Sequence, residues 1–204
     1  QGENIRRAGE DIAAGSVVLP AGVKMRAQEM GLAASIGLAD VPVYRKLPVA
    51  LFFTGDEIVM PGEPLAEGEI YNSNRYTLLG LLEGMGCRVA DYGIVPDSLE
   101  ATVEVLRQAW HEADLIVTSG GVSVGEEDHV KAAVESLGKL DMWKVAMKPG
   151  KPIAYGTVHD TPFIGLPGNP VSAFATFCLF VRPYILRCQG VAQVTPRSYM
   201  LPAT

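Results

Sequence analysis

Residues 119–128 read SGGVSVGEED, and the rest of the chain is best interpreted outward from this stretch. An apolar run, Leu115–Val117, precedes it, and a helical pattern from His129 to Leu137 follows it. The stretch is therefore predicted to be a loop between the carboxyl end of a buried strand and a helix. Its glycines allow backbone N–H groups to approach a ligand, and the N-terminus of the following helix favours an anion.

Three acidic residues end this loop: Glu126, Glu127 and Asp128. Carboxylates next to an anion site are expected where a divalent cation lies between the two. This interpretation indicates a phosphorylated ligand that is bound together with a metal. The alternative is a tight turn whose acids complement the helix dipole. The loop matches neither the GxGxxG motif nor the P-loop. The choice between a ligand site and a structural turn therefore depends on the other loops.

Two earlier segments have the same order of strand, loop and helix. The apolar run 49–53 ends at Thr54-Gly55-Asp56-Glu57, and a strand over 89–94 is followed by Asp97 and a helix over 99–112. This order predicts an α/β fold: a three-layer, mostly parallel sheet with helices on both faces. Ligands of such sheets bind outside the carboxyl ends of the strands. The acids that follow three strands are therefore expected to meet at one rim.

The second half is expected to begin with two strands, over 143–147 and 153–157. The loop between them holds Lys148 and Lys151 among prolines and a glycine. These lysines are either anion ligands or solvated turn charges. A further strand over 163–166 ends at Pro167-Gly168-Asn169-Pro170, where Asn169 is a suitable N-cap and Pro170 a suitable first helical residue.

The helix that starts at Val171 is predicted to run to about residue 187. It is apolar almost all round, which predicts a buried helix with Phe174 in the core. Pro183 is expected to kink it or to end its first part. Its apolar stretch 171–181 is too short to cross a bilayer.

Composition excludes several classes of function. The formal net charge is −6 without a long basic run, which argues against nucleic acid or an anionic membrane as the main partner. The sequence shows neither a Ser/His/Asp triad nor a His/Cys zinc set. Cys87, Cys178 and Cys188 are scattered and odd in number, which fits a reducing cytoplasm and small buried thiols.

Three regions are expected. Residues 1–45 would form a small N-terminal flanking element, 46–188 the α/β domain, and 189–204 a linker into a further, truncated domain. The chain begins with Gln1 rather than Met, so we expect a piece of a longer protein.

Six motifs in order resemble the molybdopterin molybdotransferases, the molybdenum insertases of the MoeA type, which are similar to the E domain of gephyrin. They are GENIRRAGEDI at 2–12, TGDE at 54–57, YNSN at 71–74, SGGVSVGEED at 119–128, MKPGKP at 147–152 and LPGNPVSA at 166–173.

The resemblance implies a molybdopterin-binding-like domain and a homodimer with active sites near the subunit interface. The implied reaction takes adenylylated molybdopterin and molybdate, is assisted by Mg²⁺, releases AMP and leaves molybdenum on the dithiolene. The implied protein partners are the molybdopterin adenylyltransferase and molybdoenzymes, with which substrate and product would be handed over.

The resemblance also implies site residues. The catalytic acids fall on Asp11, Glu57, Asp97 and Asp128, and Glu57, Asp97 and Asp128 are the expected metal ligands. Asp11 is expected to contribute from the interface. The positions expected to bind substrate or anion are Thr54, Gly55, Ser73, Asn74, Gly120, Gly121, Ser123, Gly125, Lys148, Lys151, Pro167, Gly168, Asn169, Pro170 and Ser172.

Two other functions stay open. The molybdopterin adenylyltransferases share the fold but usually carry a GGTG version of the central loop, where this chain has Gly120-Gly121-Val122-Ser123. A non-catalytic scaffold on the same fold is the other alternative. Because the family's upstream segment and most of its C-terminal barrel are missing from this chain, we expect the isolated chain to be inactive or poorly dimeric.

Overall fold

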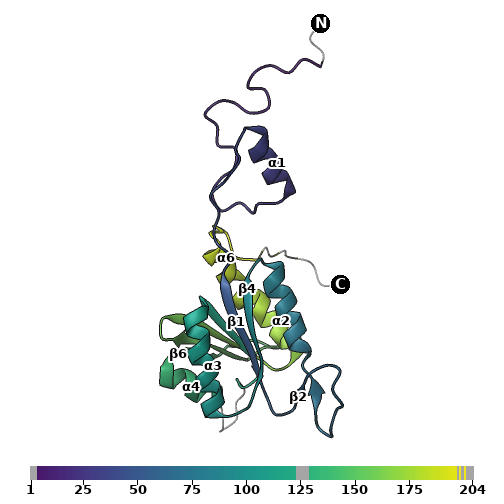
Figure 1. The fold of residues 1–204 in the computed structure, drawn as a ribbon, viewed down its shortest axis with the longest axis vertical. Coiled ribbons are helices and arrows are strands. Elements are labelled where there is room, and N and C mark those ends of the chain that lie inside the picture. Colours follow the sequence, from purple (N-terminus) through teal and green to yellow (C-terminus); the bar gives the residue numbers. More distant parts are fainter. Residues whose placement is uncertain (1–3, 123–128, 197, 199, 201–204) are drawn as a thin grey trace.

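A computed structural model describes residues 4–122, 129–196, 198 and 200 of the chain (Figure 1). Its centre is a six-stranded sheet in the order β4-β1-β5-β8-β7-β6. The strands are β1 Pro48–Thr54, β4 Arg88–Val95, β5 Leu115–Ser119, β6 Gly138–Lys144, β7 Pro152–Val158 and β8 Thr161–Leu166. The first four strands of this order pair in parallel. β7 pairs antiparallel with β8, and β6 pairs antiparallel with β7. The predicted mostly parallel sheet is confirmed.

Helices cover both faces of the sheet, as a three-layer fold requires (Figure 1). One face carries α2 and the continuous helical stretch of α5, the π-helical segment η1 and α6, and the other face carries α3 and α4. Outside these layers lie α1 and the short parallel pair β2 and β3. The bounds are α1 Ala27–Ser35, α2 Ser73–Gly84, α3 Leu99–Glu112, α4 His129–Leu137, α5 Pro170–Thr176, η1 Phe177–Val181, α6 Arg182–Cys188, β2 Ile58–Val59 and β3 Ile70–Tyr71.

The strand β1 is buried along its whole length because it lies between two hydrophobic cores. Its alternate residues point to opposite faces. Leu51 and Phe53 pack with α2 and the α5–α6 stretch, whereas Ala50 and Phe52 pack with α3 and α4. The continuous apolar run in the sequence reflects this double burial.

Side-chain caps set where three helices begin. Asn72 accepts a hydrogen bond from Arg75 N at the start of α2, and Ser98 accepts one from Ala101 N at the start of α3. Asn169 accepts one from Ser172 N at the start of α5, with Pro170 as the first helical residue. Each cap satisfies a backbone donor that has no partner inside its helix.

The predicted hairpin after α4 is present, but its first strand begins earlier in the sequence than predicted. It spans Gly138–Lys144, not 143–147, because the segment pairs with β7 as soon as α4 ends. Gly138 is needed there, since a Cβ on it would lie 2.0 Å from the carbonyl oxygen of Thr157. Residues 145–151 form the loop instead.

The prediction that the helix after Pro170 is buried all round is wrong. Phe177 is 1% exposed, but Phe174 is 49% exposed and Val171 is 66% exposed. The stretch lies on one face of the sheet, so only one side of it reaches the core. The helical path continues past Pro183, and the irregularity takes the form of the π-helical segment Phe177–Val181 just before it.

The same stretch, Pro170–Cys188, is long and apolar enough to pass a length-and-hydropathy test for a membrane span, with a mean hydropathy of 1.3 over its best window. Here Phe177, Val181 and Ile185 belong to the core on the α2 face of the sheet. Core helices of globular domains pass the same test. Packing therefore accounts for the core-facing side of the stretch, and 33% of the window is buried.

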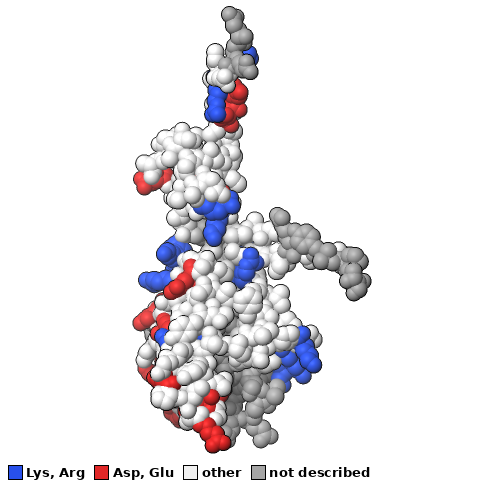
Figure 2. All heavy atoms as spheres, turned by 90° about the vertical axis from the view of Figure 1, so that its right-hand side faces the viewer, with Lys and Arg blue, Asp and Glu red and all other residues white. Residues whose placement is uncertain are grey.

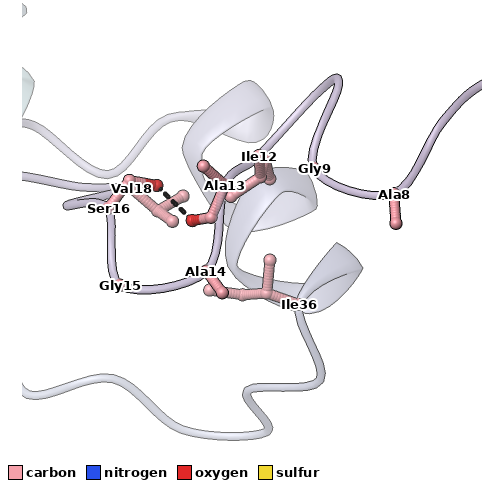
Figure 3. Close-up of a pocket in the computed structure, with 9 residues that line it drawn as sticks. All are labelled: Ala8, Gly9, Ile12, Ala13, Ala14, Gly15, Ser16, Val18 and Ile36. Carbon is pink, nitrogen blue, oxygen red and sulfur yellow. Dashed lines mark hydrogen bonds between the residues drawn. The ribbon is translucent and has the colours of Figure 1, made fainter.

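The N-terminal segment extends from the end of the domain that carries α6, away from β2 (Figure 1). Its residues 8–18 curl beside the end of α1 and line an open hollow of about 760 Å³ with Ile36 (Figure 3). The lining side chains are small or apolar apart from Ser16, whose hydroxyl is bound to Ala13 O at 2.7 Å. The side chains that line this hollow therefore offer no positive charge to an anion.

The buried thiol of Cys87 is expected to react slowly with alkylating reagents. Burial, with a smaller contribution from neighbouring Cys188, raises its pKa from 9.0 to about 11. The thiolate is the nucleophile, so a shift of this size lowers its reactive fraction about 100-fold at pH 8. Iodoacetamide labelling followed by peptide mass spectrometry measures this rate. The urea-unfolded chain is the control. Equal rates in the two states would show that the turn between α2 and β4, which holds Cys87, is open in the folded protein.

Candidate functional site

Four parallel strands place their carboxyl ends along one rim of the sheet. β4, β1, β5 and β8 are adjacent in that order, and each is followed by a loop with polar residues or glycines. The loops begin at Pro96, Gly55, Gly120 and Pro167. This is the position at which α/β proteins bind ligands, and it holds most of the predicted site residues.

Two of the predicted acids, Glu57 and Asp97, follow the neighbouring strands β1 and β4 at this rim. The Thr54 hydroxyl donates to Asp97 Oδ1 at 3.2 Å, which joins the two strand ends. Ser98 caps α3, so the Asp97 carboxylate is not needed as a cap. The Glu57 carboxylate folds over Gly55, since a Cβ on Gly55 would lie 2.7 Å from Glu57 Oε2. Two of the predicted acids thus lie on neighbouring loops.

The glycines after β5 are required by close packing against β1. A Cβ on Gly120 would lie 2.1 Å from Thr54 O, and a Cβ on Gly121 would lie 2.6 Å from Thr54 Cγ2. Gly120 also donates its backbone N–H to Leu166 O at 3.2 Å, and its φ is +96°. Here glycine brings the backbone against the neighbouring strand ends, a requirement that exists without any ligand.

Gly120→Ala is expected to destabilise the domain. The backbone conformation alone costs about 1–3 kcal/mol for a residue with a side chain, and the contact with Thr54 O adds to this. Gly80→Ala is the matched control: Gly80 lies inside α2 with open space at its Cβ, so alanine should stabilise by up to about 1 kcal/mol. Urea unfolding of both variants measures the difference. Equal stabilities would show that the loop can move away from β1.

A buried hydrogen-bonded chain joins the loops after β5 and β8. Asn74 Nδ2 donates to Ser119 Oγ at 2.9 Å and to Gly168 O at 2.8 Å, and Ser119 Oγ donates to Pro167 O at 2.9 Å. Asn74 is 8% exposed and Ser119 is 3% exposed. Ser119 was not among the predicted site residues. The available signal was the pair of polar residues, Thr118 and Ser119, that ends a strand beginning with an apolar run.

The loop with the two lysines lies at the same end of the sheet, because β7 is antiparallel to β8. Its Gly150 packs on α5, since a Cβ there would lie 2.7 Å from Thr176 Cγ2. Lys148 and Lys151 are exposed. These exposed ammonium groups, at the same end of the sheet as the Pro167–Pro170 loop, are available to an anion.

The remaining predicted site residues are distributed as follows. Ser73 is exposed in the first turn of α2, and Ser172 is buried in the first turn of α5. Asp11 pairs with Arg6 at 2.7 Å in the N-terminal segment, which extends from the opposite end of the domain (Figure 1). The structure of a single chain therefore does not bring Asp11 to the rim. Ser123, Gly125 and Asp128 lie outside the described residues.

Hard oxygen donors at the rim fit a divalent cation in kind. Thr54, Glu57 and Asp97 supply hydroxyl and carboxylate oxygens, which Mg²⁺ prefers. Among the described residues there is no group of three or more His, Cys, Asp or Glu side chains able to hold a metal. The third expected acid, Asp128, is not among them. The donor chemistry fits, while the described residues alone do not complete a metal site.

Acidic and basic side chains gather in separate patches on the surface of this molecule. Viewed from the side of α2, acidic side chains lie along one edge of the α/β domain, and basic side chains lie at the upper part of that edge and at the opposite edge (Figure 2). The formal net charge of −6 gives no overall attraction for an anion. An anion bound at the rim would therefore depend on backbone amides and the two lysines nearby.

Two family models match the chain. Residues 50–187 match the probable molybdopterin binding domain, and residues 1–37 match the MoeA N-terminal region, domains I and II. Similar curated proteins include a molybdopterin molybdenumtransferase of Haemophilus influenzae, 48% identical over 94% of this chain and 47% of its own length. Gephyrin of Dictyostelium discoideum is 35% identical over 93% of this chain and 30% of its own length. The chain spans about half the length, or less, of these relatives.

Solved structures agree with this assignment. A molybdopterin biosynthesis MoeA protein of Pyrococcus horikoshii superposes with a TM-score of 0.81 at 33% identity, over 89% of this chain and 45% of that one. The molybdopterin biosynthesis enzyme MoaB of Thermus thermophilus superposes with a TM-score of 0.53 at 25% identity, over 71% of this chain and 97% of its own. The chain therefore belongs to the molybdopterin-binding domain family and, with its MoeA N-terminal region, to the MoeA-type proteins within it.

Proposed function

We propose that the full-length parent of this chain is a molybdopterin molybdenumtransferase, which inserts molybdate into adenylylated molybdopterin and releases AMP. The observation that carries the proposal is the convergence at one rim of Asp97, Glu57 and two glycine-containing loops. Membership of the MoeA-type proteins supports it, because relatives with that activity in their names are 48% and 39% identical to this chain.

The rim offers what this reaction needs. Molybdate and the phosphate of an adenylate are anions, and backbone amides in the loops after β5 and β8 can bind them without a general positive charge. Lys148 and Lys151 are exposed on the loop between β6 and β7 and add positive charge that can pair with the anions. The buried floor of Thr54 and Ser119 keeps these loops close to the sheet.

The acids are proposed to hold a cation and to orient water. Glu57 and Asp97, together with Asp128, would bind Mg²⁺, which neutralises negative charge that develops on a leaving phosphate. The carboxylate of Asp97 is already oriented by the Thr54 hydroxyl. We propose no division of roles between these acids.

Asp11 is proposed to act at a subunit interface, since its own chain holds it away from the rim. A homodimer would bring the N-terminal segment of one subunit to the rim of the other. The cytoplasm is the proposed location, and handover with an adenylyltransferase and with molybdoenzymes is proposed for the product.

The test uses the full-length parent with adenylylated molybdopterin and Mg²⁺, and follows AMP release with and without molybdate. Release that depends on molybdate, with activation of an apo-molybdoenzyme, is the expected result. Tight adenylate binding without release would instead favour a scaffold.

The adenylyltransferase, whose fold the sequence resemblance implies as well, is the second candidate; 71% of this chain superposes on 97% of a molybdopterin biosynthesis enzyme of Thermus thermophilus. It is tested with ATP and molybdopterin. Formation of adenylylated molybdopterin by the parent without a partner protein would reverse the proposed order of the two functions.

A further inference from the structure

The hydrogen-bonded chain through Asn74 and Ser119 uses every proton that these two side chains can donate. A side-chain amide has two N–H groups, and those of Asn74 go to Ser119 Oγ and Gly168 O. The single hydroxyl proton of Ser119 goes to Pro167 O. Neither side chain therefore has a donor left for an anion.

The remaining acceptor of Asn74 is also turned away from solvent. Its Oδ1 is buried and has no hydrogen-bond partner among the described residues. Leaving a buried acceptor unpaired is unfavourable. The two bonds that the amide nitrogen of Asn74 donates must offset this cost for the side chain to stay in this position. These bonds end on the loops that follow β5 and β8.

The link lies where the two loops come close to each other. Gly168 approaches Gly120, because a Cβ on Gly168 would lie 4.0 Å from Gly120 Cα. Gly120 in turn lies against Thr54 O at the end of β1. A side chain from α2, an element outside the sheet, thus adds a link between the loops after β5 and β8 to the strand pairing that ends at Ser119 and Leu166.

We propose that Asn74 and Ser119 are positioning residues that hold the Gly120–Gly121 loop and the Pro167–Asn169 loop at the spacing needed to bind the anion between them. The inference rests on the proposed function and deepens it. Asn74 acts through the loops and does not touch the substrate. Displacement of an anion site by about 1 Å is enough to cost catalysis up to about 100-fold.

Three variants of the full-length parent test this inference. Ser119→Ala removes the shared hydroxyl, Asn74→Leu removes both donors at similar size, and the double variant combines them. Thr118→Val is the matched control, because the Thr118 hydroxyl is buried one residue away and has no partner among the described residues. Ser119→Cys, a near-isosteric variant with a weaker donor, replaces Ser119→Ala if that protein does not fold.

The first readout needs no substrate. Amide hydrogen exchange of peptides that cover 120–122 and 166–169 is expected to accelerate about tenfold or more in the two single variants, because each loses a bond that holds these loops. Exchange in the control is expected to stay at the level of the parent. Parent-like exchange in both loops of both single variants would overturn the proposal, whatever reaction the protein performs.

The second readout is the split between kcat and KM in the AMP-release assay. Positioning predicts a fall in kcat of about tenfold or more in each single variant. It predicts a larger fall in the double variant, because Ser119→Ala keeps the bond of Asn74 to Gly168 O and Asn74→Leu keeps the bond of Ser119 to Pro167 O. A purely structural role predicts a lower Tm with kcat preserved, which would contradict the proposal. If the parent releases no AMP, the proposed function fails while hydrogen exchange still decides the positioning role.

Discussion

Asp97→Asn in the full-length parent is expected to lower AMP release about 100-fold or more, with almost no loss of stability. Asparagine keeps the size of aspartate and an oxygen that can accept the Thr54 hydroxyl, so the bond between the ends of β1 and β4 can persist. Only the negative charge is lost. Removing one preorganised electrostatic group from an active site costs roughly 100- to 1,000-fold in turnover.

The measurement combines AMP-release kinetics with thermal unfolding. Glu57→Gln is expected to behave like Asp97→Asn, because Glu57 is exposed at the same rim. Exposed substitutions usually change stability by less than about 0.5 kcal/mol, which is roughly 2 °C in Tm for a chain of this size.

Asp56→Asn is the matched control for this pair. Asp56 neighbours Glu57 in the same exposed turn. It is not one of the four acids that the resemblance to the molybdotransferases implies. Its turnover is expected to stay within about twofold of the parent. A comparable loss in Asp56→Asn would show that the rim needs general negative charge, and a large fall in Tm for Asp97→Asn would show that Asp97 is a structural group.

Phe177→Ala is expected to destabilise the α/β domain by about 3–5 kcal/mol. Phe177 is 1% exposed and lies in the core formed by β1, β5, α2 and the α5–α6 stretch. Its removal leaves a cavity next to strands that cannot move without disrupting the sheet. The corresponding fall in Tm is about 6–20 °C, measured by calorimetry or by the loss of far-ultraviolet circular dichroism.

Phe174→Ala supplies the control from the same helical stretch. The two phenylalanines lie three residues apart, but Phe174 is 49% exposed, so its truncation is expected to cost less than about 1.5 kcal/mol. Similar losses for both variants would show that the exposed face of α5 is covered by another part of the full-length protein.

The parts of the fold that could be predicted from sequence are those set by local pattern. The bounds of α3 and of α4 agree with the predicted residues 99–112 and 129–137, because caps and amphipathic periodicity act within a few residues. The run 49–53 predicted a strand buried on both faces, and β1 is buried throughout.

The errors arose where composition was a poor guide to contact. The apolar stretch after Pro170 predicted complete burial, but a helix on one face of a sheet buries only one side, which left Phe174 and Val171 exposed. The strand β6 begins five residues earlier than predicted, since its start is set by pairing with β7 rather than by its own sequence.

At the candidate site, the sequence by itself determined which residues follow the strand ends, and the order of strands and helices determined that these ends share a rim. Only the tertiary structure decided which of them touch. The contacts of Thr54 with Asp97 and of Asn74 with Ser119 and Gly168 join residues 43 to 94 positions apart. Such contacts depend on the packing of whole elements, for which a local pattern carries no information.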